Sequence, residues 1–245
     1  MLLALDTDII IYKSILTTEQ EIDWGDDVWT LYTDLKEAQK VFKKQLETIQ
    51  LRLKSDEILC CLTDAKDNFR KHISPSYKSN RKGTRKPVGY VALVEWVRDT
   101  YPSLSKPSLE ADDVLGIIAT KPENKGKVIV VSDDKDLKTV PGKLYRPMQD
   151  EALDITEADA DAFFLQQCLQ GDAVDGYGGL KGVGEKTAKK ILGIRPVWDS
   201  VEQAYIKAGY TRDDALEQAR LARILRWTDW DEKKGGPILW TPQNT

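Results

Sequence analysis

The stretch Val128-Ile-Val-Val-Ser-Asp-Asp-Lys-Asp-Leu137 decides the expected fold, because four β-branched residues are followed at once by three carboxylates. A short β-branched run of this kind is typical of a buried strand. Open α/β sheets bind their ligands beyond the carboxyl ends of the strands, which is where these acids would lie. The stretch therefore predicts an α/β protein with a central, mostly parallel sheet flanked by helices.

Further acids stand where other predicted strands end or where predicted helices begin. They are Asp6 with Asp8, Asp64, Glu110-Ala-Asp-Asp113, and Asp172 with Asp175. The helix dipole would explain one acid at residues 110–113, but not three. Carboxylates that converge repel one another unless a cation holds them, and hard divalent ions such as Mg²⁺ take carboxylate oxygens. The pattern predicts a metal site that carries out phosphate chemistry.

A basic segment follows Asp64. Between residues 66 and 86 one acid stands against eight bases, which are Lys66, Arg70, Lys71, Lys78, Arg81, Lys82, Arg85 and Lys86. Phe69 and Tyr77 are interleaved with them. Taken alone, the segment fits an exposed loop. Because it accompanies the acid clusters, we interpret it as a clamp for a phosphate backbone.

The segment from Gly171 to Leu192 is rich in glycine and lysine. In it, Gly182-Val-Gly184 precedes a predicted helix with Lys186, Lys189 and Lys190 near its start. A glycine turn that opens a helix presents free backbone N–H groups, which bind phosphates. The segment therefore predicts a helix-hairpin-helix element that grips a duplex backbone without reading its sequence.

Hydrophobic periodicity predicts the other elements. One long amphipathic helix is expected from Val28 to Leu53, and another helix from Ala158 to Leu169 with Thr156 as its N-cap. Tyr145-Arg-Pro is expected to be a short connection. A small hairpin is expected within residues 227–240, with its tryptophans packed against the body.

The composition narrows the possible functions. The chain has 245 residues, 31% of them charged, and a net charge of -4, which is ordinary for a globular protein. A metal site would collect many of the acids, so this charge does not exclude a nucleic-acid partner. A single histidine, His72, rules out most Ser/His and Cys/His schemes. Three cysteines without metal-ligand spacing, and the lack of a signal peptide or bilayer-length apolar run, predict reduced thiols, a cytoplasmic setting and no membrane.

Seven motifs occur in one order along nearly the whole chain. They are Asp6 after the first strand, Thr63-Asp64, Phe69-Arg-Lys followed by Tyr77-Lys-Ser-Asn-Arg81, Lys86-Pro-Val-Gly-Tyr90, Leu109-Glu-Ala-Asp-Asp113, Ser132-Asp-Asp-Lys-Asp-Leu137 and the glycine-rich stretch. Together they resemble the 5′→3′ exonuclease and flap endonuclease superfamily, and above all the stand-alone 5′→3′ exonucleases of bacteriophages.

The resemblance implies a PIN-like or resolvase-like catalytic domain over residues 1–155, with a basic arch at residues 66–87. It implies a C-terminal helical DNA-binding domain over residues 156–245, with a helix-three-turn-helix module at residues 171–192. Two departures from the family are visible. Val174-Asp-Gly-Tyr-Gly178 replaces the usual Ser-Asp-Asn-Ile-Pro, and the segment from Arg81 to Val88 is short for a full helical arch.

The resemblance also implies a site with two or more Mg²⁺ ions, for which Mn²⁺ can substitute. The ligands of the first ion would be Asp6, Asp64, Glu110 and Asp112, with Asp113 supporting through water. Those of the second would be Asp134, Asp136, Asp172 and Asp175, with Asp112 as a possible bridge. Lys78 and Arg81 match the positively charged catalytic residues that such enzymes place against the scissile phosphate, where they would stabilise charge in the transition state. Asp8 and Asp133 fall beside the matched positions, so they are not counted among the expected metal ligands.

The implied DNA contacts lie in the arch and in the C-terminal module. Tyr12 resembles an aromatic residue that stacks on a nucleobase, and simple packing explains it equally well. The other implied contacts are Arg70, Lys71, Tyr77, Lys82, Gly182, Gly184, Lys186, Lys189 and Lys190. The turn of the module would also hold K⁺ through backbone carbonyls.

The implied activity is metal-dependent 5′→3′ exodeoxyribonuclease action on duplex ends, with flap endonuclease and RNA-primer removal, in phage replication, recombination and breakdown of host DNA. The expected partners are duplex DNA with 5′ ends or flaps, RNA-DNA primer junctions and a single-strand DNA-binding protein. The chain is expected to be a monomer in the host cytoplasm.

Two alternatives stay open at this point. Asp6-Thr-Asp8 after a strand and Gly171-Asp-x-x-Asp175 also suit a haloacid-dehalogenase-type phosphatase, with Asp6 as nucleophile. That scheme leaves Glu110 and the basic segment without a use. The other alternative is a catalytically dead, structure-specific DNA-binding protein, against which the full set of acids argues.

Overall fold

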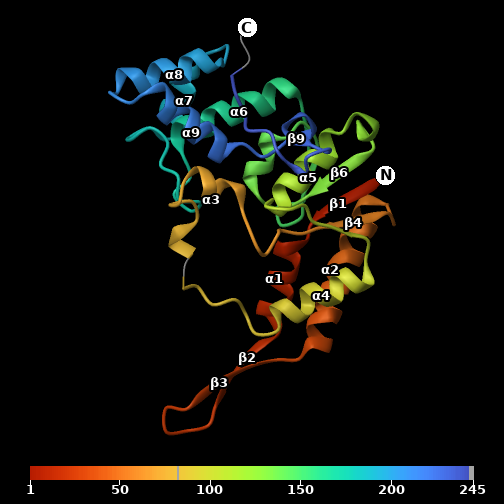
Figure 1. The fold of residues 1–245 in the computed structure, drawn as a ribbon. Helices are drawn as coiled ribbons and strands as arrows, with labels where there is room; N and C mark the ends of the chain where they lie inside the picture. The colour runs from red at the N-terminus through yellow and green to blue at the C-terminus, as the bar shows by residue number, and fades with distance from the viewer. Residues whose placement is uncertain (82, 243–245) are drawn as a thin grey trace.

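The computed structural model of the chain describes residues 1–81 and 83–242. At its centre is a six-stranded sheet with the order β5-β4-β1-β6-β7-β8 (Figure 1). The strands are β1 (Leu2–Asp6), β4 (Ile58–Cys61), β5 (Ser103–Leu104), β6 (Val128–Val131), β7 (Gly142–Arg146) and β8 (Glu151–Ile155). All neighbours are parallel except β7 and β8. The predicted mostly parallel sheet is confirmed, and the carboxyl ends of β4, β1 and β6 lie side by side.

Helices cover both faces of the sheet. Successive side chains of β1 point to opposite faces, and because both sets are apolar, each face is buried under helices. Leu3 and Leu5 pack with α1 (Thr7–Thr18), α2 (Leu35–Leu53) and α4 (Tyr90–Thr100). Ala4 packs on the other side with α5 (Ala111–Thr120) and with Ile224 and Leu225. The N-terminal and C-terminal parts of the chain therefore share the core on this face of the sheet.

Four helices form the C-terminal region, which has a core of its own. They are α6 (Glu157–Gln170), α7 (Glu185–Leu192), α8 (Trp198–Lys207) and α9 (Arg212–Ala222). Thr156 accepts a hydrogen bond from the backbone N–H of Asp159, so the predicted helix and its N-cap are confirmed. The short 3₁₀ helix η4 (Trp227–Asp229) precedes the predicted small hairpin, which pairs β9 (Trp230–Asp231) with β10 (Gly236–Pro237).

Short elements connect the larger ones around the sheet edge. They are α3 (Phe69–Ile73), η1 (Ser79–Arg81), η2 (Pro122–Asn124) and η3 (Lys135–Thr139). After α3 the chain leaves the C-terminal helices and runs to the start of α4, beside a projecting two-stranded ribbon (Figure 1). This path follows the predicted basic arch.

The predicted long helix from Val28 to Leu53 is wrong in its first part. Residues 19–33 form an antiparallel hairpin of β2 (Glu19–Asp23) and β3 (Trp29–Thr33), and α2 begins only at Leu35. Asp34 caps α2 by accepting a hydrogen bond from the backbone N–H of Lys36. The β-branched and aromatic residues of segment 28–33 favour a strand, and this preference decides the local structure.

The predicted connection at Tyr145 is also wrong, because Tyr145 lies within β7 and pairs with Val131 and Ala152. Strand β7 is held by its pairing with β6 and β8, which hydrophobic periodicity does not reveal. Within residues 1–81 and 83–242, no helix combines the length and the hydropathy needed to cross a membrane.

Candidate active site

The carboxyl ends of β1 and β6 and the start of α5 bring Asp6, Asp134 and Asp112 together. Burial raises the pKa of Asp6 to about 7, and the charges of Asp8 and Asp134 add to the rise. Ser132 Oγ donates a hydrogen bond to Asp6 at 2.6 Å, which lowers this pKa but does not outweigh the burial. Burial raises the pKa of Asp112 well above its ordinary value, and the charges of Asp6 and Asp134 contribute. Carboxylates held this close need positive charge nearby to stay ionised.

Asp136 and Asp172 extend this group toward the C-terminal helices. Asp136 Oδ1 accepts a hydrogen bond from Gln167 Nε2 of α6 at 2.5 Å. Burial raises the pKa of Asp136 to about 7, and the charge of Asp134 contributes. Lys135 Nζ lies 3.0 Å from Asp172 Oδ2 and offsets part of the negative charge.

Lys78 and Arg81, the two positively charged residues predicted to be catalytic, contact the acids Glu110 and Asp175 of this site. Lys78 Nζ donates a hydrogen bond to Glu110 Oε1 at 2.5 Å and lies 3.4 Å from Asp175 Oδ2. Arg81 Nη2 donates to Asp175 Oδ1 at 2.7 Å. Burial alone would lower the pKa of Lys78, but Glu110 and Asp175 outweigh it and raise that pKa, so the ammonium keeps its charge.

A close backbone contact fixes Lys78 beside Asp175. The backbone N–H of Lys78 donates to the carbonyl oxygen of Asp175 at 2.8 Å. The next residue, Gly176, has a φ of +77°, and a Cβ there would lie 2.8 Å from the carbonyl oxygen of Ser76. The glycine is therefore needed for two segments that are about 100 residues apart to meet.

Two predicted metal ligands have other partners. Asp64 accepts hydrogen bonds from the backbone N–H groups of Lys66 and Ser108, which lower its pKa and shape the loop after β4. Asp113 is fully buried, and both of its oxygens lie 2.7 Å from the guanidinium of Arg70. The acids that the structure brings together are Asp6, Glu110, Asp112, Asp134, Asp136, Asp172 and Asp175.

Arg70 and Tyr77, predicted to contact DNA, lie inside the protein, each only 3% exposed. Besides binding Asp113, Arg70 donates to the carbonyl oxygens of Leu221 and Arg223, which joins α3 and α5 to the end of α9. Tyr77 Oη donates to Glu110 Oε2 at 2.8 Å. The geometry thus corrects the expected role of both residues, which hold the site together rather than face a ligand.

The other predicted DNA contacts lie mainly on the surface. Lys71, Lys186, Lys189 and Lys190 are exposed. Tyr12 is 42% exposed, and its ring meets that of Tyr90 edge to face at 6.5 Å, so both packing and stacking remain open to it. Gly182 has a φ of +78°, and Gly184 is the N-cap of α7. Lys82 lies outside the described residues.

Sequence reasoning missed Gln167 altogether. Its side chain is 1% exposed, its Nε2 holds Asp136, and its Oε1 is buried without a partner among the described residues. A glutamine on the apolar face of a predicted helix is the signal that could have identified it, since buried polar groups need partners. Ser132 and Lys135 lie within a quoted motif, but their contacts with Asp6 and Asp172 could not be read from it.

The donor chemistry of this edge fits hard divalent cations, because the donors are carboxylate oxygens. Among residues 1–81 and 83–242, no three His, Cys, Asp or Glu side chains already surround one point at ligand distances. Hydrogen bonds from Ser132, Lys78 and Gln167 engage several of the oxygens. Burial is the main cause that raises the pKa values of Asp6 and Asp136, and neighbouring carboxylates add to it, so a cation at this edge would favour the ionised form of both.

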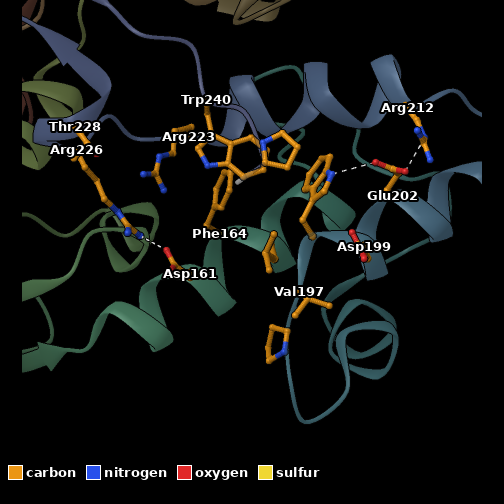
Figure 2. Close-up of a pocket in the computed structure, with 14 residues that line it drawn as sticks. Asp161, Phe164, Val197, Asp199, Glu202, Arg212, Arg223, Arg226, Thr228 and Trp240 are labelled. Carbon is orange, nitrogen blue, oxygen red and sulfur yellow. Dashed lines mark hydrogen bonds and ion pairs between the residues drawn. The ribbon is translucent and has the colours of Figure 1, made fainter. Parts of the chain in front are cut away.

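A cavity of about 730 Å³ lies elsewhere, among the C-terminal helices (Figure 2). Trp240 of the tail lines it and packs between Phe164 and Trp198, with ring centroids 5.1 and 4.9 Å away. Its arginines are paired with acids, Arg226 with Asp161 and Arg212 with Glu202. The cavity therefore anchors the tail, and the expected packing of Trp240 against the body is confirmed.

A mostly parallel sheet with clustered carboxylates at its carboxyl edge, and with the basic residues Lys78 and Arg81 beside them, is the arrangement expected of a hydrolase that acts on phosphoesters. Comparison with known proteins narrows this class. The family described as 5′-3′ exonuclease, N-terminal resolvase-like domain matches residues 1–162. The chain therefore belongs to the 5′-3′ exonuclease family.

Phage enzymes are among the similar proteins. An exodeoxyribonuclease of Enterobacteria phage T3 is 29% identical over 99% of this chain and 93% of its own length. An exonuclease of Escherichia phage T7 is 28% identical over 98% of this chain and 93% of its own. The D15 flap endonuclease of bacteriophage T5 has the same fold, with a TM-score of 0.64 and 16% identity over 90% of this chain and 88% of its own.

The enzyme class predicted from the sequence, a 5′-3′ exonuclease or flap endonuclease close to phage enzymes, is thus confirmed. Neither alternative, the phosphatase or the inactive DNA-binding protein, is favoured by these relatives.

Proposed function

We propose that the chain is a Mg²⁺-dependent 5′→3′ exodeoxyribonuclease that acts on duplex DNA ends, cuts 5′ flaps and removes RNA primers. The observation that carries the proposal is the convergence of seven acids from four segments beside Lys78 and Arg81. The T5 flap endonuclease was solved in a complex with DNA and metal ions, and the T5 5′-exonuclease with zinc, which supports a divalent cation and a DNA substrate here.

The acids divide into two groups in this proposal. Asp6, Glu110 and Asp112 would hold one cation, and Asp134, Asp136, Asp172 and Asp175 the other. Such a pair of cations would turn water into a nucleophile and stabilise the leaving 3′ oxygen. Asp64 and Asp113 would act indirectly, Asp64 by shaping the loop after β4 and Asp113 by fixing the start of α5.

Lys78 and Arg81 would lie against the scissile phosphate and stabilise the charge that develops on it in the transition state. Their ammonium and guanidinium groups lie at the boundary between the two groups of acids, through Glu110 and Asp175. Ser132 and Gln167 would keep Asp6 and Asp136 in position by hydrogen bonds. The phosphate is thus bound by side chains that backbone contacts have already placed.

The DNA backbone would be gripped away from the chemistry. Residues 1–155 would form the catalytic domain, and residues 156–245 the DNA-binding domain. Gly182, Gly184, Lys186, Lys189 and Lys190 would hold the duplex at the start of α7, with K⁺ at the turn. Lys71 and Tyr12 would contact the strand near the cut. The protein would act as a monomer in the host cytoplasm, together with a single-strand DNA-binding protein.

Duplex DNA labelled separately at its 5′ and 3′ ends tests the proposal. In Mg²⁺, short products should appear rapidly from the 5′ label alone, and EDTA should abolish them. Release from the 3′ label, or equal release in EDTA, would contradict it. A second substrate, 5′-phosphorylated RNA annealed to DNA, tests primer removal: the RNA should be released in Mg²⁺ and not in EDTA.

A further inference from the structure

One lysine beside the second group of acids has no part in the proposed reaction. Lys135 is the first residue of η3, and its Nζ donates a hydrogen bond to Asp172 Oδ2 at 3.0 Å. The same nitrogen lies 3.9 Å from Asp136 Oδ1. Burial alone would lower the pKa of Lys135, but the hydrogen bond to Asp172 and the charge of Asp136 outweigh it and raise that pKa. The ammonium therefore keeps its charge among the acids.

Both carboxylate oxygens of Asp172 are engaged. Its Oδ1 accepts hydrogen bonds from the backbone N–H groups of Val174 and Asp175, at 2.8 and 3.3 Å. Its Oδ2 accepts the bond from Lys135. A cation that takes Oδ2 as a ligand meets the ammonium there, and two positive charges at one oxygen repel each other. Cation binding at Asp172 therefore requires the ammonium of Lys135 to move.

Lys135 has room to move, whereas Lys78 is held in place. The side chain of Lys135 is 54% exposed, against 15% for that of Lys78. The backbone N–H of Lys78 is also tied to the carbonyl oxygen of Asp175. Of these two lysines, Lys135 is thus the one that can give up its acid and turn toward a ligand outside the protein.

The start of α7, where the duplex backbone would be held, lies near Lys135. A hydrogen bond from Lys189 is the main cause that lowers the pKa of Glu185, in the first turn of α7, and the charge of Lys135 adds to it. The ammonium is therefore close both to the acids and to the proposed path of the DNA backbone. A phosphate on that path is the partner that a displaced ammonium would find.

We propose that Lys135 is a mobile counter-ion, which holds Asp172 until a divalent cation binds there and then moves to a phosphate of the DNA backbone. One positive charge replaces another at Asp172, and the displaced ammonium adds one contact to the DNA. Cation binding and DNA binding strengthen each other through this residue, because such coupling is reciprocal. The inference rests on the proposed function and adds the residue that couples its two ligands.

Matched variants separate this exchange from a general effect of charge. Lys135→Met removes the ammonium and keeps a side chain of similar shape, and Lys135→Arg keeps a positive charge. Lys138→Met is the control, because Lys138 lies in the same 3₁₀ helix and forms no ion pair within residues 1–81 and 83–242. Neither lysine belongs to the proposed catalytic set.

The first measurement needs no DNA. Mn²⁺ is titrated into the protein, and the free ion is followed by electron paramagnetic resonance. Lys135→Met should bind Mn²⁺ roughly twofold to fivefold more tightly than the unaltered protein, because no ammonium has to leave Asp172, and this is the range of one partly exposed ion pair. Lys138→Met should match the unaltered protein. Equal affinities in the two methionine variants would overturn the exchange.

The second measurement follows duplex affinity against salt concentration, in EDTA and in Ca²⁺, which takes the same kind of oxygen ligands. Each phosphate contact adds about 0.9 to the slope of log affinity against log salt. In Ca²⁺ the slope should be about 0.9 shallower for Lys135→Met than for the unaltered protein and Lys135→Arg. In EDTA these slopes should coincide, because Asp172 still holds the ammonium. A difference of the same size in both media, or in neither, would overturn the exchange.

A failure of the proposed function would look different. If the unaltered protein binds neither Mn²⁺ nor duplex DNA, the proposed function is wrong, and the exchange is wrong with it. If the unaltered protein binds both and cleaves DNA, while Lys135→Met behaves like Lys138→Met, the exchange alone is wrong.

Discussion

Replacing Arg70 by alanine should destabilise the protein strongly, because Arg70 lies inside rather than at a DNA surface. The change would remove two bonds of 2.7 Å to Asp113 and those to the carbonyl oxygens of Leu221 and Arg223. It would leave the Asp113 carboxylate fully buried, with bonds only from backbone N–H groups. Breaking a buried pair in this way costs about 3–5 kcal/mol. For a chain of this length that lowers Tm by roughly 6–20 °C.

Urea unfolding followed by tryptophan fluorescence, in EDTA at pH 7, measures the effect. The control is Lys71→Ala, an exposed neighbour on α3, which should change the free energy of unfolding by less than about 0.5 kcal/mol. Combining Arg70→Met with Asp113→Leu should recover much of the loss, because both charges then leave the interior. The reasoning is refuted if Arg70→Ala leaves the unfolding free energy unchanged and weakens DNA binding.

Three further changes test other parts of the site. Gly176→Ala should cost about 1–3 kcal/mol of stability, since its φ is +77° and its Cβ would meet Ser76, whereas Gly178→Ala, in open space, should be neutral in the same urea titration. Lys78→Met should slow single-turnover cleavage at least about 100-fold but change DNA binding little, because a group that stabilises the transition state is lost. A loss of DNA affinity as large as the loss of cleavage rate would contradict this. Burial and neighbouring carboxylates raise the pKa of Asp6 to about 7, so ionised Asp6 destabilises the metal-free fold, and this burden falls as pH drops from 7 toward 4. Asp6→Asn should therefore unfold at higher temperature than the unaltered protein at pH 8 in EDTA, and the difference should shrink by pH 5; a constant difference would exclude this cause.

The parts that local pattern determines could be predicted from the sequence. β6 follows from its β-branched run, and α6 from its periodicity and its Thr156 cap. The convergence of Asp6, Asp112 and Asp134 follows from their places at strand and helix ends in a parallel sheet.

The remainder depends on contacts between segments, which a local pattern does not show. Strand β3 looked helical because its apolar residues continue the spacing of α2, and its pairing with β2 makes it a strand instead. Arg70 and Tyr77 stand in a run of bases that suggests a surface, yet Asp113 and Glu110 from another helix bury them. Gln167 gave no motif, because its role depends on where α6 packs against η3.

The most direct test of the central claim is the cleavage rate of 5′-labelled duplex DNA in Mg²⁺ by a variant with Asp134→Asn and Asp136→Asn. Circular dichroism and an unchanged duplex affinity would establish that the variant is folded and binds DNA. If the acids at the edge of the sheet carry the chemistry, the rate should fall at least about 1000-fold, as expected when metal ligands are lost. Turnover close to that of the unaltered protein would contradict the assignment of the active site.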